Sequence, residues 1–373
     1  MHVLWFNMKM DEGDPLLAFT IDWVNAFARY VDRVTVVTMV AGTYRVRDNV
    51  RVLSMGKERG FSEPRRALEF YRLVGRTLRR DPVDACFAHM VPLFAVMAAP
   101  LLKLYRVPTV LWYAHGHVPR ILRVAHRLVD REMTSMPNAF RIPSTKLHVV
   151  GQGVDTDVFV PAPRGTPAPA DAFTVVHVGR LSPIKDLGTL VAAADELVNR
   201  RGRTELRVEL VGDVCIPSDE AYRAELEGMV RRAGLQEHVR FRGAMAFREV
   251  PSCYVDADVA FNGCPTGAPD KAALEALACG VPLVASNETF TGILGGDAPG
   301  LVFRQGDAAD LADKLERLAG RGAAERRALG MRLRDTVVAD HSLDRWARLL
   351  LRIIGEVTGG TRAARASLEP SDP

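Results

Sequence analysis

The segment 177–186 holds the strongest concentration of residues that could bind an anion. Gly179 follows the apolar run 174–178, and Arg180 and Lys185 come within the next six positions. A β-branched run of this kind predicts a strand, and glycine permits a tight turn after it. Arginine offers a planar fork of N–H donors and lysine a mobile point charge, so together they suit the oxygens of a diphosphate. We interpret the segment as a diphosphate site, with two ordinary surface cations as the alternative.

A second candidate segment runs from 271 to 286. Its first part predicts a helix, because apolar residues recur at 274, 277 and 278 and Gly280 suits the left-handed residue that ends a helix. Glu275 lies one step off this apolar stripe, where its carboxylate could accept hydrogen bonds from paired ligand hydroxyls. The alternative is a solvated surface glutamate.

The elements that must position these residues alternate along the chain. Short β-branched runs alternate with amphipathic stretches, which is typical of a parallel sheet flanked by helices. The expected strands of the first half are 3–6, 34–38, 50–53, 85–88, 109–113 and 148–150. Those of the second half are 174–178, 207–211, 239–241, 259–261, 282–285 and 301–303. The proline-rich residues 161–170 read as a linker, so the pattern predicts two Rossmann-like halves whose site lies in the cleft between them.

Composition excludes several classes of protein. The chain has 373 residues, of which 48% are hydrophobic and 25% charged, so it has apolar material for two cores and is neither disordered nor collagen-like. Its five cysteines are scattered and form no C-x-x-C pair, which argues against a zinc site or a disulfide framework. The first residues lack the basic segment of a secretory signal, and the most apolar stretch, 91–102, is too short to span a bilayer. We therefore expect a soluble cytoplasmic protein, which could still be peripheral to the inner face of the membrane.

Charge is distributed unevenly along the chain. Residues 1–160 contain 22 Lys and Arg against 15 Asp and Glu, whereas the rest contains 27 against 30. Part of the basic excess falls in 64–80, a predicted helix with Leu68, Tyr71, Val74 and Leu78 on one face and arginines over most of the other. Such a helix can lie on an anionic leaflet, and the alternative is a sheet-packed helix with a solvated basic face. Nucleic acid is not an expected partner, because the basic segment shows no recognised nucleic-acid-binding module.

The order of these motifs resembles that of a known enzyme family. The segments that carry the resemblance are 179–185, Val211-Gly212-Asp213, 239–243 and 274–286, preceded by 111–115 and 151–161 and followed by 341–346. This succession, which covers almost the whole chain, resembles the retaining GT-B glycosyltransferases of family 4 (glycosyl transferases group 1). The resemblance implies an α/β GT-B fold with two Rossmann-like domains that face each other across a cleft. The implied parts are an acceptor domain 1–160, a donor domain 170–342, a helix 343–358 that crosses back onto the first domain, and a flexible tail 359–373.

The resemblance also implies a reaction and residue roles. A sugar moves from a nucleoside-diphosphate sugar to a hydroxyl acceptor (glycan, lipid-linked compound or small molecule) with retention of configuration, and no metal or cofactor is required. Arg180 and Lys185 match the pair that holds the donor diphosphate, and His115 matches a histidine that reaches toward the donor sugar. Glu275 matches the second glutamate of the family's E-x7-E motif, which binds the ribose. Gly179 and Gly212 belong to the same donor site.

Two segments depart from the family pattern. Gly267 stands where the first glutamate of E-x7-E is expected, so the backbone amides of Gly267 and Ala268, or the side chains of Asp270 or Lys271, are the candidates for contact with the donor sugar. The first loop lacks the usual glycine-rich turn. There Gly13 is the candidate for close approach to the diphosphate, and Asp11 and Glu12 are candidates on the acceptor side.

Gly267 leaves a second class of function open. Without the first glutamate, the chain could bind a nucleotide sugar and not turn it over. A third reading is another GT-B activity, such as epimerisation of a nucleotide sugar. Two D-x-D strings, 155–157 and 256–258, are interpreted as turn residues because nothing in the sequence makes metal ligands converge there.

Overall fold

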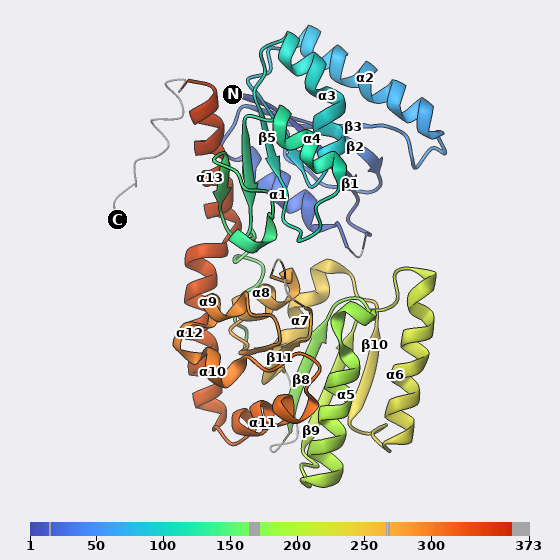
Figure 1. The fold of residues 1–373 in the computed structure, drawn as a ribbon, viewed down its shortest axis with the longest axis vertical. Coiled ribbons are helices and arrows are strands. Elements are labelled where there is room, and N and C mark those ends of the chain that lie inside the picture. The colour runs from blue at the N-terminus through green and yellow to red at the C-terminus, as the bar shows by residue number, and fades with distance from the viewer. Residues whose placement is uncertain (15, 164–171, 266, 268, 360–373) are drawn as a thin grey trace. The chain divides into compact units, whose positions relative to one another are not determined.

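The structure, a computed structural model, describes residues 1–14, 16–163, 172–265, 267 and 269–359. Its contacts divide the chain into two units (Figure 1). Unit 1 comprises Met1–Gly153 and Ser342–Pro373, and unit 2 comprises Val154–His341. The first division therefore precedes the expected boundary at 160, because Val154 and Phe159 are buried in the core of unit 2.

In the described part of unit 1 a parallel sheet has the order β3-β2-β1-β4-β5-β6-β7. Its strands are β1 (His2–Met10), β2 (Arg33–Ala41), β3 (Val50–Ser54), β4 (Ala85–His89), β5 (Thr109–Trp112), β6 (Arg131–Thr134) and β7 (Leu147–Val149). Its helices are α1 (Phe19–Ala28), α2 (Glu63–Arg80), α3 (Pro92–Leu104), α4 (Arg120–Leu128) and α13 (Leu343–Val357). Helices α2, α3 and α4 share one core on one face of the sheet, whereas α1 and α13 pack in the core on the other face.

The core beneath α1 and α13 contains all four tryptophans of the chain. Trp346 of α13 lies against Trp5, Trp23 and Trp112, with the Trp23 ring centroid 4.2 Å away. The apolar residues of 343–357 form a buried stripe along α13, and this stripe completes the core of unit 1. The chain returns from unit 2 to unit 1 at Ser342, as the expected crossing helix requires.

The described part of unit 2 has a parallel sheet of order β10-β9-β8-β11-β12. Its strands are β8 (Phe173–Val178), β9 (Leu206–Val211), β10 (Val239–Gly243), β11 (Val259–Asn262) and β12 (Leu283–Ala285). Its helices are α5 (Leu187–Asp195), α6 (Glu220–Arg232), α7 (Val250–Val255), α8 (Lys271–Ala278), α9 (Phe290–Leu294), α10 (Ala298–Leu301), α11 (Ala308–Ala319) and α12 (Ala323–His341). Each unit is thus an α/β domain built on a parallel sheet, which confirms the predicted fold class.

Two strand predictions need correction. Strand β6 was missed because its sequence, Arg-Glu-Met-Thr, looks polar. Glu132 is nevertheless fully buried there, since its carboxylate accepts hydrogen bonds from Ser144 Oγ at 2.6 Å and pairs with His126 Nδ1 at 2.9 Å. The expected strand 301–303 is wrong. The Val302 amide closes a helical turn onto Ala298, so only an isolated bridge to β12 forms.

The expected basic helix 64–80 is helix α2, but its buried face differs from the prediction. Phe70, Leu73, Val74 and Leu78 face the sheet, whereas Leu68 and Tyr71 are exposed. Helix α2 contains two sets of apolar residues at helical spacing, one with Leu68 and Tyr71 and one with Phe70 and Leu73. The prediction chose the first set, whereas the second is the buried one.

Two further expectations fall partly on undescribed residues. Within the linker 161–170, residues 164 onward lie outside the described part of the chain, as does the tail beyond 359. No helix among the described residues is long and apolar enough to cross a membrane.

Candidate functional site

Three strand ends of unit 2 form the core of the candidate site. At the end of β8, the Gly179 amide donates to the Val211 carbonyl of β9 at 2.9 Å, and Gly179 has a φ of 152°. Gly212 has a φ of 129°, and a Cβ on it would lie 1.9 Å from the Gly179 carbonyl oxygen. Only glycine fits this contact, so the two backbones approach more closely than side chains would permit. The predicted glycine turn therefore lies at the carboxyl edge of the sheet, where α/β folds bind ligands.

Lys185 follows that turn and is held by Asp270. Its ammonium forms an ion pair with the Asp270 carboxylate, which also accepts from Asn262 Nδ2 at 3.0 Å and from Cys264 Sγ at 3.4 Å. Asp270 occupies the N-cap position of α8, yet its side chain does not cap that helix. It instead ties α8 to the end of β11 and to the 3₁₀ turn Pro183–Lys185.

The environment shifts the proton affinities of this cluster. Burial by itself would raise the pKa of Asp270, but the Lys185 ammonium outweighs burial and lowers that pKa to about 2. The pKa of Lys185 is raised, because Asp270 outweighs the effect of burial. Burial raises the pKa of Cys264 to about 12, so its thiol keeps its proton and donates to Asp270. The ion pair therefore stays charged at neutral pH.

His177 lies in β8, close to the glycine turn. Burial, and then the charge of Lys185, lower the pKa of His177 to about 4, so its ring is neutral at neutral pH. Its Nε2 is buried and has no hydrogen-bond partner among the described residues. A Cβ on Gly179 would lie 3.2 Å from that Nε2, so the ring stands directly beside the turn.

Arg180 differs from Lys185 although both were predicted as one pair. It is half-buried and makes no hydrogen bond or ion pair with any part of the chain that the structure describes. Each charged hydrogen bond from a guanidinium to an oxyanion is short and strong. The site thus contains one cation fixed by a carboxylate and one whose donors are available to an anionic ligand.

Glu275 is not the solvated surface residue of the alternative interpretation. It lies on α8 and is 4% exposed, and the Lys271 ammonium is 2.5 Å from its Oε1. That ammonium also lies 5.0 Å from the centre of the Phe247 ring. A buried carboxylate needs such a partner to remain ionised. Lys271 and Glu275 therefore act as a unit on the first turns of α8.

The loop before α8 is anchored at the position of the missing glutamate and two residues before it. Gly267 has a φ of 144°, and a Cβ on it would meet no other atom within 4 Å. Its carbonyl accepts from Thr289 Oγ1 at 2.8 Å, and the Pro265 carbonyl accepts from Asn287 Nδ2 at 3.1 Å. Ala268 lies outside the described residues.

The candidates of unit 1 lie on two loops at the carboxyl ends of its strands. His115 is exposed three residues past β5, and its Nδ1 accepts the His117 amide at 2.9 Å, so the neutral ring carries its proton on Nε2. Asp11 accepts the Gly13 amide at 3.1 Å, while Glu12 accepts the amide of Arg45 at 3.0 Å. Both candidate carboxylates of the first loop are thus engaged within unit 1.

The sequence interpretation overlooked Asn262 and Cys264. A detectable signal was present, because Asn262 is a polar residue directly after the apolar run 259–261, at the carboxyl end of a parallel strand. Cys264 follows two residues later and carries no pattern of its own.

The D-x-D strings have other structural partners. The Asp155 carboxylate accepts the Asp157 amide at 3.1 Å, and Asp258 pairs with Arg326 at 2.9 Å. Across the described ranges, no group of three or more His, Cys, Asp or Glu side chains is arranged to hold a metal ion.

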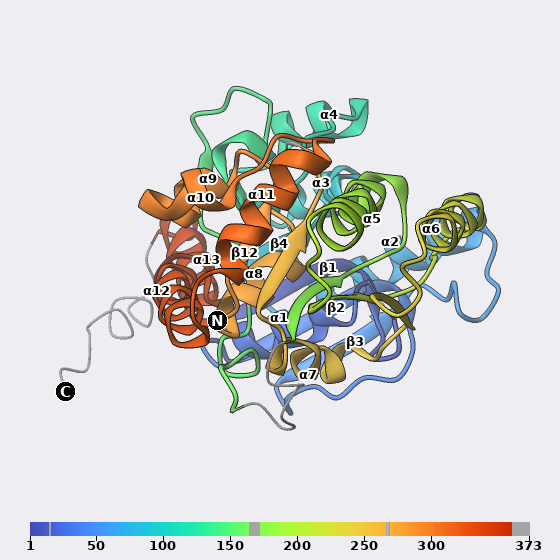
Figure 2. The same ribbon diagram turned by 90° about the horizontal axis from the view of Figure 1, so that it is seen from below.

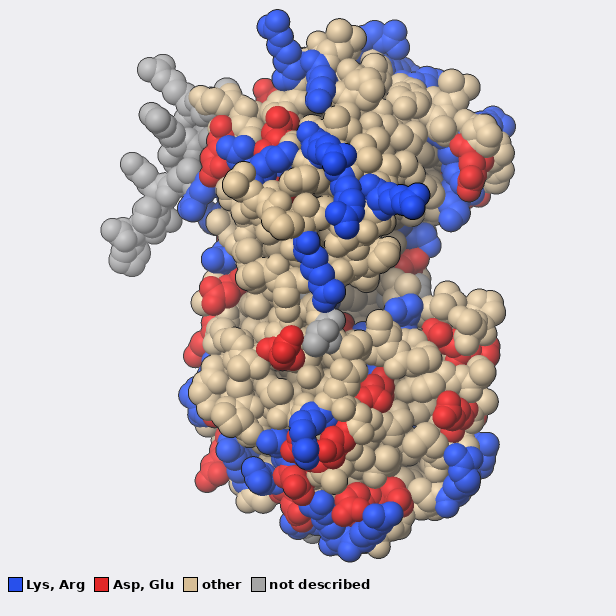
Figure 3. Space-filling view, viewed as in Figure 1, with Lys and Arg blue, Asp and Glu red and all other residues tan. Residues whose placement is uncertain are grey.

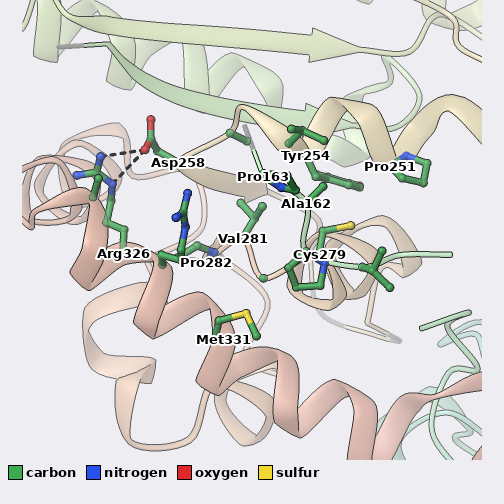
Figure 4. A pocket seen from close by; sticks show the side chains of 17 residues that line it. Ala162, Pro163, Pro251, Tyr254, Asp258, Cys279, Val281, Pro282, Arg326 and Met331 are labelled. Atoms are coloured by element: carbon green, nitrogen blue, oxygen red, sulfur yellow. Dashed lines mark hydrogen bonds and ion pairs between the residues drawn. The ribbon is translucent and has the colours of Figure 1, made fainter. Parts of the chain in front are cut away.

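A pocket of about 310 Å³ in unit 2 lies elsewhere than the candidate site (Figure 4). The Asp258–Arg326 pair stands at one side, with Tyr254, Cys279 and Met331 around the hollow. Asp258 directly precedes β11, so this pocket is at the amino end of that strand, opposite the end that carries Asn262. It therefore contributes nothing to the cluster around Lys185.

Comparison with known proteins connects this arrangement to a family. Residues 172–321, which lie within unit 2, match the family model described as "Glycosyl transferases group 1". A D-inositol 3-phosphate glycosyltransferase of Kineococcus radiotolerans is 33% identical over 178 residues, which is 45% of this chain and 41% of that protein. The enzyme of the same name from Actinosynnema mirum is 31% identical over 214 residues, 54% and 50% of the two chains. The match thus spans half or less of the length of these relatives.

Solved structures resemble the fold over almost the whole chain. Anabaena HepE in complex with UDP has a TM-score of 0.76 and 19% identity, covering 95% of this chain and all of that one. Sucrose-phosphate synthase of Thermosynechococcus elongatus has a TM-score of 0.78 and 18% identity, covering 96% and 99%. At this identity the likeness concerns the fold. Residues 172–321 thus resemble the glycosyl transferases group 1 family, and the two parallel-sheet domains have the GT-B fold.

Proposed function

We propose that the chain transfers a sugar from a nucleoside-diphosphate sugar to a hydroxyl acceptor, with retention of configuration and with the donor bound by unit 2. The observation that carries the proposal is the state of Arg180. Its guanidinium, beside the Gly179–Gly212 contact, has no partner in the part of the chain that the structure describes, which leaves donors and backbone space for an anion at the carboxyl edge of the sheet. The match of residues 172–321 to the family model of glycosyl transferases group 1 supports the same assignment.

The donor diphosphate is proposed to bind between Arg180 and Lys185. Because Asp270 already neutralises Lys185, the lysine is fixed in position and shares its charge with the ligand, whereas Arg180 contributes a full charge. As the bond to the sugar breaks, negative charge grows on the diphosphate oxygens. Cations already in place stabilise that charge without having to reorganise.

The ribose and the sugar are assigned to the start of α8. Glu275, held by Lys271, is proposed to accept the ribose hydroxyls. The sugar is assigned to the backbone of the Gly267 loop and to Asp270, in place of the missing glutamate. His115 of unit 1, whose Nε2 carries the proton, is the proposed sugar-side donor, and Asp11 and Glu12 remain candidates for the acceptor.

The chemistry needs no protein nucleophile in this proposal. An oxygen of the leaving diphosphate takes the acceptor proton as the new glycosidic bond forms on the face that the diphosphate leaves. The anomeric configuration is thereby retained. No residue of the site needs to change its charge during the step.

Gly267 supports a second candidate function, that of a nucleotide-sugar-binding protein without turnover. The side chain that the family uses is absent, and the anchored loop offers only backbone groups at that position. Binding and turnover separate the two functions. A binder is stabilised by a nucleoside diphosphate yet releases none from any donor sugar.

The first experiment is a thermal-shift panel of UDP, GDP, ADP, dTDP and CDP on wild type, Glu275→Gln and the exposed control Glu325→Ala. A ligand present at about 100 times its Kd adds about 2.7 kcal/mol to the free energy of unfolding. We expect one diphosphate to stabilise wild type and the control, and to lose most of its effect in Glu275→Gln. If no diphosphate stabilises the folded wild type, the donor site is wrong.

Turnover with the matching sugar donor follows, with glycans, lipid-linked alcohols and inositol phosphate as acceptors. Inositol phosphate is included because the relatives from Kineococcus radiotolerans and Actinosynnema mirum are named for it. Release of nucleotide only with an acceptor supports transfer. An altered sugar without an acceptor would instead indicate epimerisation.

A further inference from the structure

Helices α2, α3 and α4 form one layer over one face of the unit 1 sheet. Their inward side chains share a single core, and α3 packs against both of its neighbours. Figures 1 and 2 both show α3 between α2 and α4. The outward side chains of the three helices therefore make one continuous surface, here called the α2–α4 face.

The middle of this surface is apolar. Helix α3 contains one charged residue, Lys103, and buries Phe94, Ala95, Ala98 and Leu102. Leu93 and Leu104 point the other way and are 49% and 75% exposed, with the exposed Pro100 between them on the same side. This helix covers most of the most apolar stretch of the sequence, and it exposes Leu93, Pro100 and Leu104 to solvent.

Arginines lie on α2, to one side of this apolar ridge. At 100° per residue, Arg65, Arg72, Arg76 and Arg79 all point away from the buried stripe of α2. Leu68, in the same line, is 71% exposed, and Tyr71 beside it is 43% exposed. Thus α2 presents cations together with a leucine and a tyrosine.

Helix α4 provides cations on the other side of the ridge. Arg120, Arg123 and Arg127 are exposed together with Val124, and the sequence 120–128 contains no acidic residue. Figure 3 shows Lys and Arg side chains distributed over this part of unit 1, separated mainly by uncharged surface.

Acidic side chains offset little of this charge. Glu69 of α2 is bonded to Arg72 at 2.7 Å, and Glu63 lies 3.6 Å from Arg66. Within the described ranges, the other arginines of α2 and α4 named above form no ion pair. The face thus combines net positive charge with large exposed apolar side chains, a combination that solvent alone does not favour.

We propose that the α2–α4 face docks flat on an anionic lipid bilayer. Arginines on the two outer helices attract the anionic headgroups, while Leu68, Leu93 and Leu104 enter the interface beneath them. A second copy of this chain fits the face poorly, because two arginine-rich surfaces would repel each other. The unit would lie on the membrane, with its sheet parallel to the surface, and would not span it.

Docking has a consequence for the acceptor. If the proposed glycosyl transfer holds, a unit 1 that rests on a bilayer is positioned to receive a lipid-linked acceptor. This consequence depends on the proposed function, but the docking itself does not. Vesicle binding measured without any nucleotide sugar therefore tests the surface alone.

The test is co-sedimentation of the full chain with vesicles of phosphatidylcholine alone or mixed with phosphatidylglycerol, at about 0.05 M and 0.5 M salt. We expect binding to the anionic vesicles only, reduced at least about tenfold by the higher salt. Leu93→Ser/Leu104→Ser should weaken binding at least about tenfold, and so should Arg123→Glu/Arg127→Glu. Matched changes on unit 2, Ile216→Ser/Val338→Ser and Arg231→Glu/Arg232→Glu, should leave binding unchanged.

Heparin retention separates a membrane from other polyanions. The leucine variant should bind heparin as wild type does, because its charge is intact, while it loses the vesicles. Failure of wild type to bind anionic vesicles overturns the proposal. So does a leucine variant that binds them as well as wild type, which would indicate a purely electrostatic surface suited to an acidic protein or nucleic acid. Circular dichroism of each variant confirms that it is folded.

Discussion

Cations serve two different purposes in the two units. In unit 2, Lys185 is largely buried and fixed by Asp270, with Asn262 and Cys264 completing the contacts. On the α2–α4 face of unit 1, arginines such as Arg76 and Arg123 extend into solvent. A desolvated and paired charge is costly to disturb and has one geometry, which suits a specific ligand. Solvated charges act over a Debye length and have no fixed geometry, which suits an extended anionic surface.

Removal of the buried cation is expected to have the largest effect on stability. Lys185→Met leaves the Asp270 carboxylate without its counter-ion, so we expect the free energy of unfolding of unit 2 to fall by about 3 kcal/mol. Urea unfolding followed by circular dichroism measures this loss. Tryptophan fluorescence is the internal control, since all four tryptophans are in unit 1. The double variant Lys185→Met/Asp270→Asn should recover part of the stability. If Lys185→Met alone were as stable as wild type, the pairing would be contradicted.

The pH dependence of stability tests the same cluster. The pKa of His177 is lowered from 6.5 to about 4 in the folded protein. As the pH falls below 6.5, the His177 ring is therefore protonated in the unfolded chain before it is protonated in the folded one. Stability is therefore lost between pH 6.5 and 4, by about 3 kcal/mol over the whole window. His177→Gln should flatten this slope in the unfolding of unit 2. Burial lowers the pKa of His89 in unit 1 to about 3. The stability of unit 1, measured by tryptophan fluorescence, should therefore still fall with pH in the His177→Gln variant.

Arg180 tests whether a cation of the site can serve the ligand without serving the fold, because it has no partner in the described chain. Arg180→Ala should change the ligand-free free energy of unfolding by less than about 0.5 kcal/mol, as for a surface position. It should nevertheless remove most of the diphosphate stabilisation, which is about 2.7 kcal/mol at 100 times the Kd. The thermal-shift panel measures both quantities, with Arg231→Ala as the matched control. An unchanged ligand response would assign the diphosphate elsewhere.

The smallest effect is expected on the α2–α4 face itself. Arg76→Glu/Arg123→Glu should alter stability by less than about 0.5 kcal/mol per site, because exposed charges interact weakly through water. Urea unfolding by tryptophan fluorescence measures this directly in unit 1. A large loss would mean that these arginines serve the fold, and the functional reading of the face would fail.

Sequence patterns were most reliable where a residue's role depends on its immediate neighbours. The glycine turn at 179 and the helix that ends at Gly280 follow from local backbone requirements, and both are present. Strand β6 was missed because the burial of Glu132 depends on His126 and Ser144, which come from other segments. The outward position of Leu68 was missed for a related reason, since α2 contains two possible apolar stripes and only the sheet decides between them.

By itself, the sequence determined the alternation of strands and helices, the glycine at the close approach, and the order of motifs that resembles the glycosyl transferases group 1 pattern. These depend on hydrophobic period and on local backbone sterics, which neighbouring residues encode. Only the tertiary structure decided that Asp270 holds Lys185 from 85 positions away and that Arg180 has no partner among the described residues. It also decided that α3 turns Leu93 and Leu104 outward between two basic helices. Such pairings depend on which strand ends meet at one edge of a sheet and which helix faces that sheet covers.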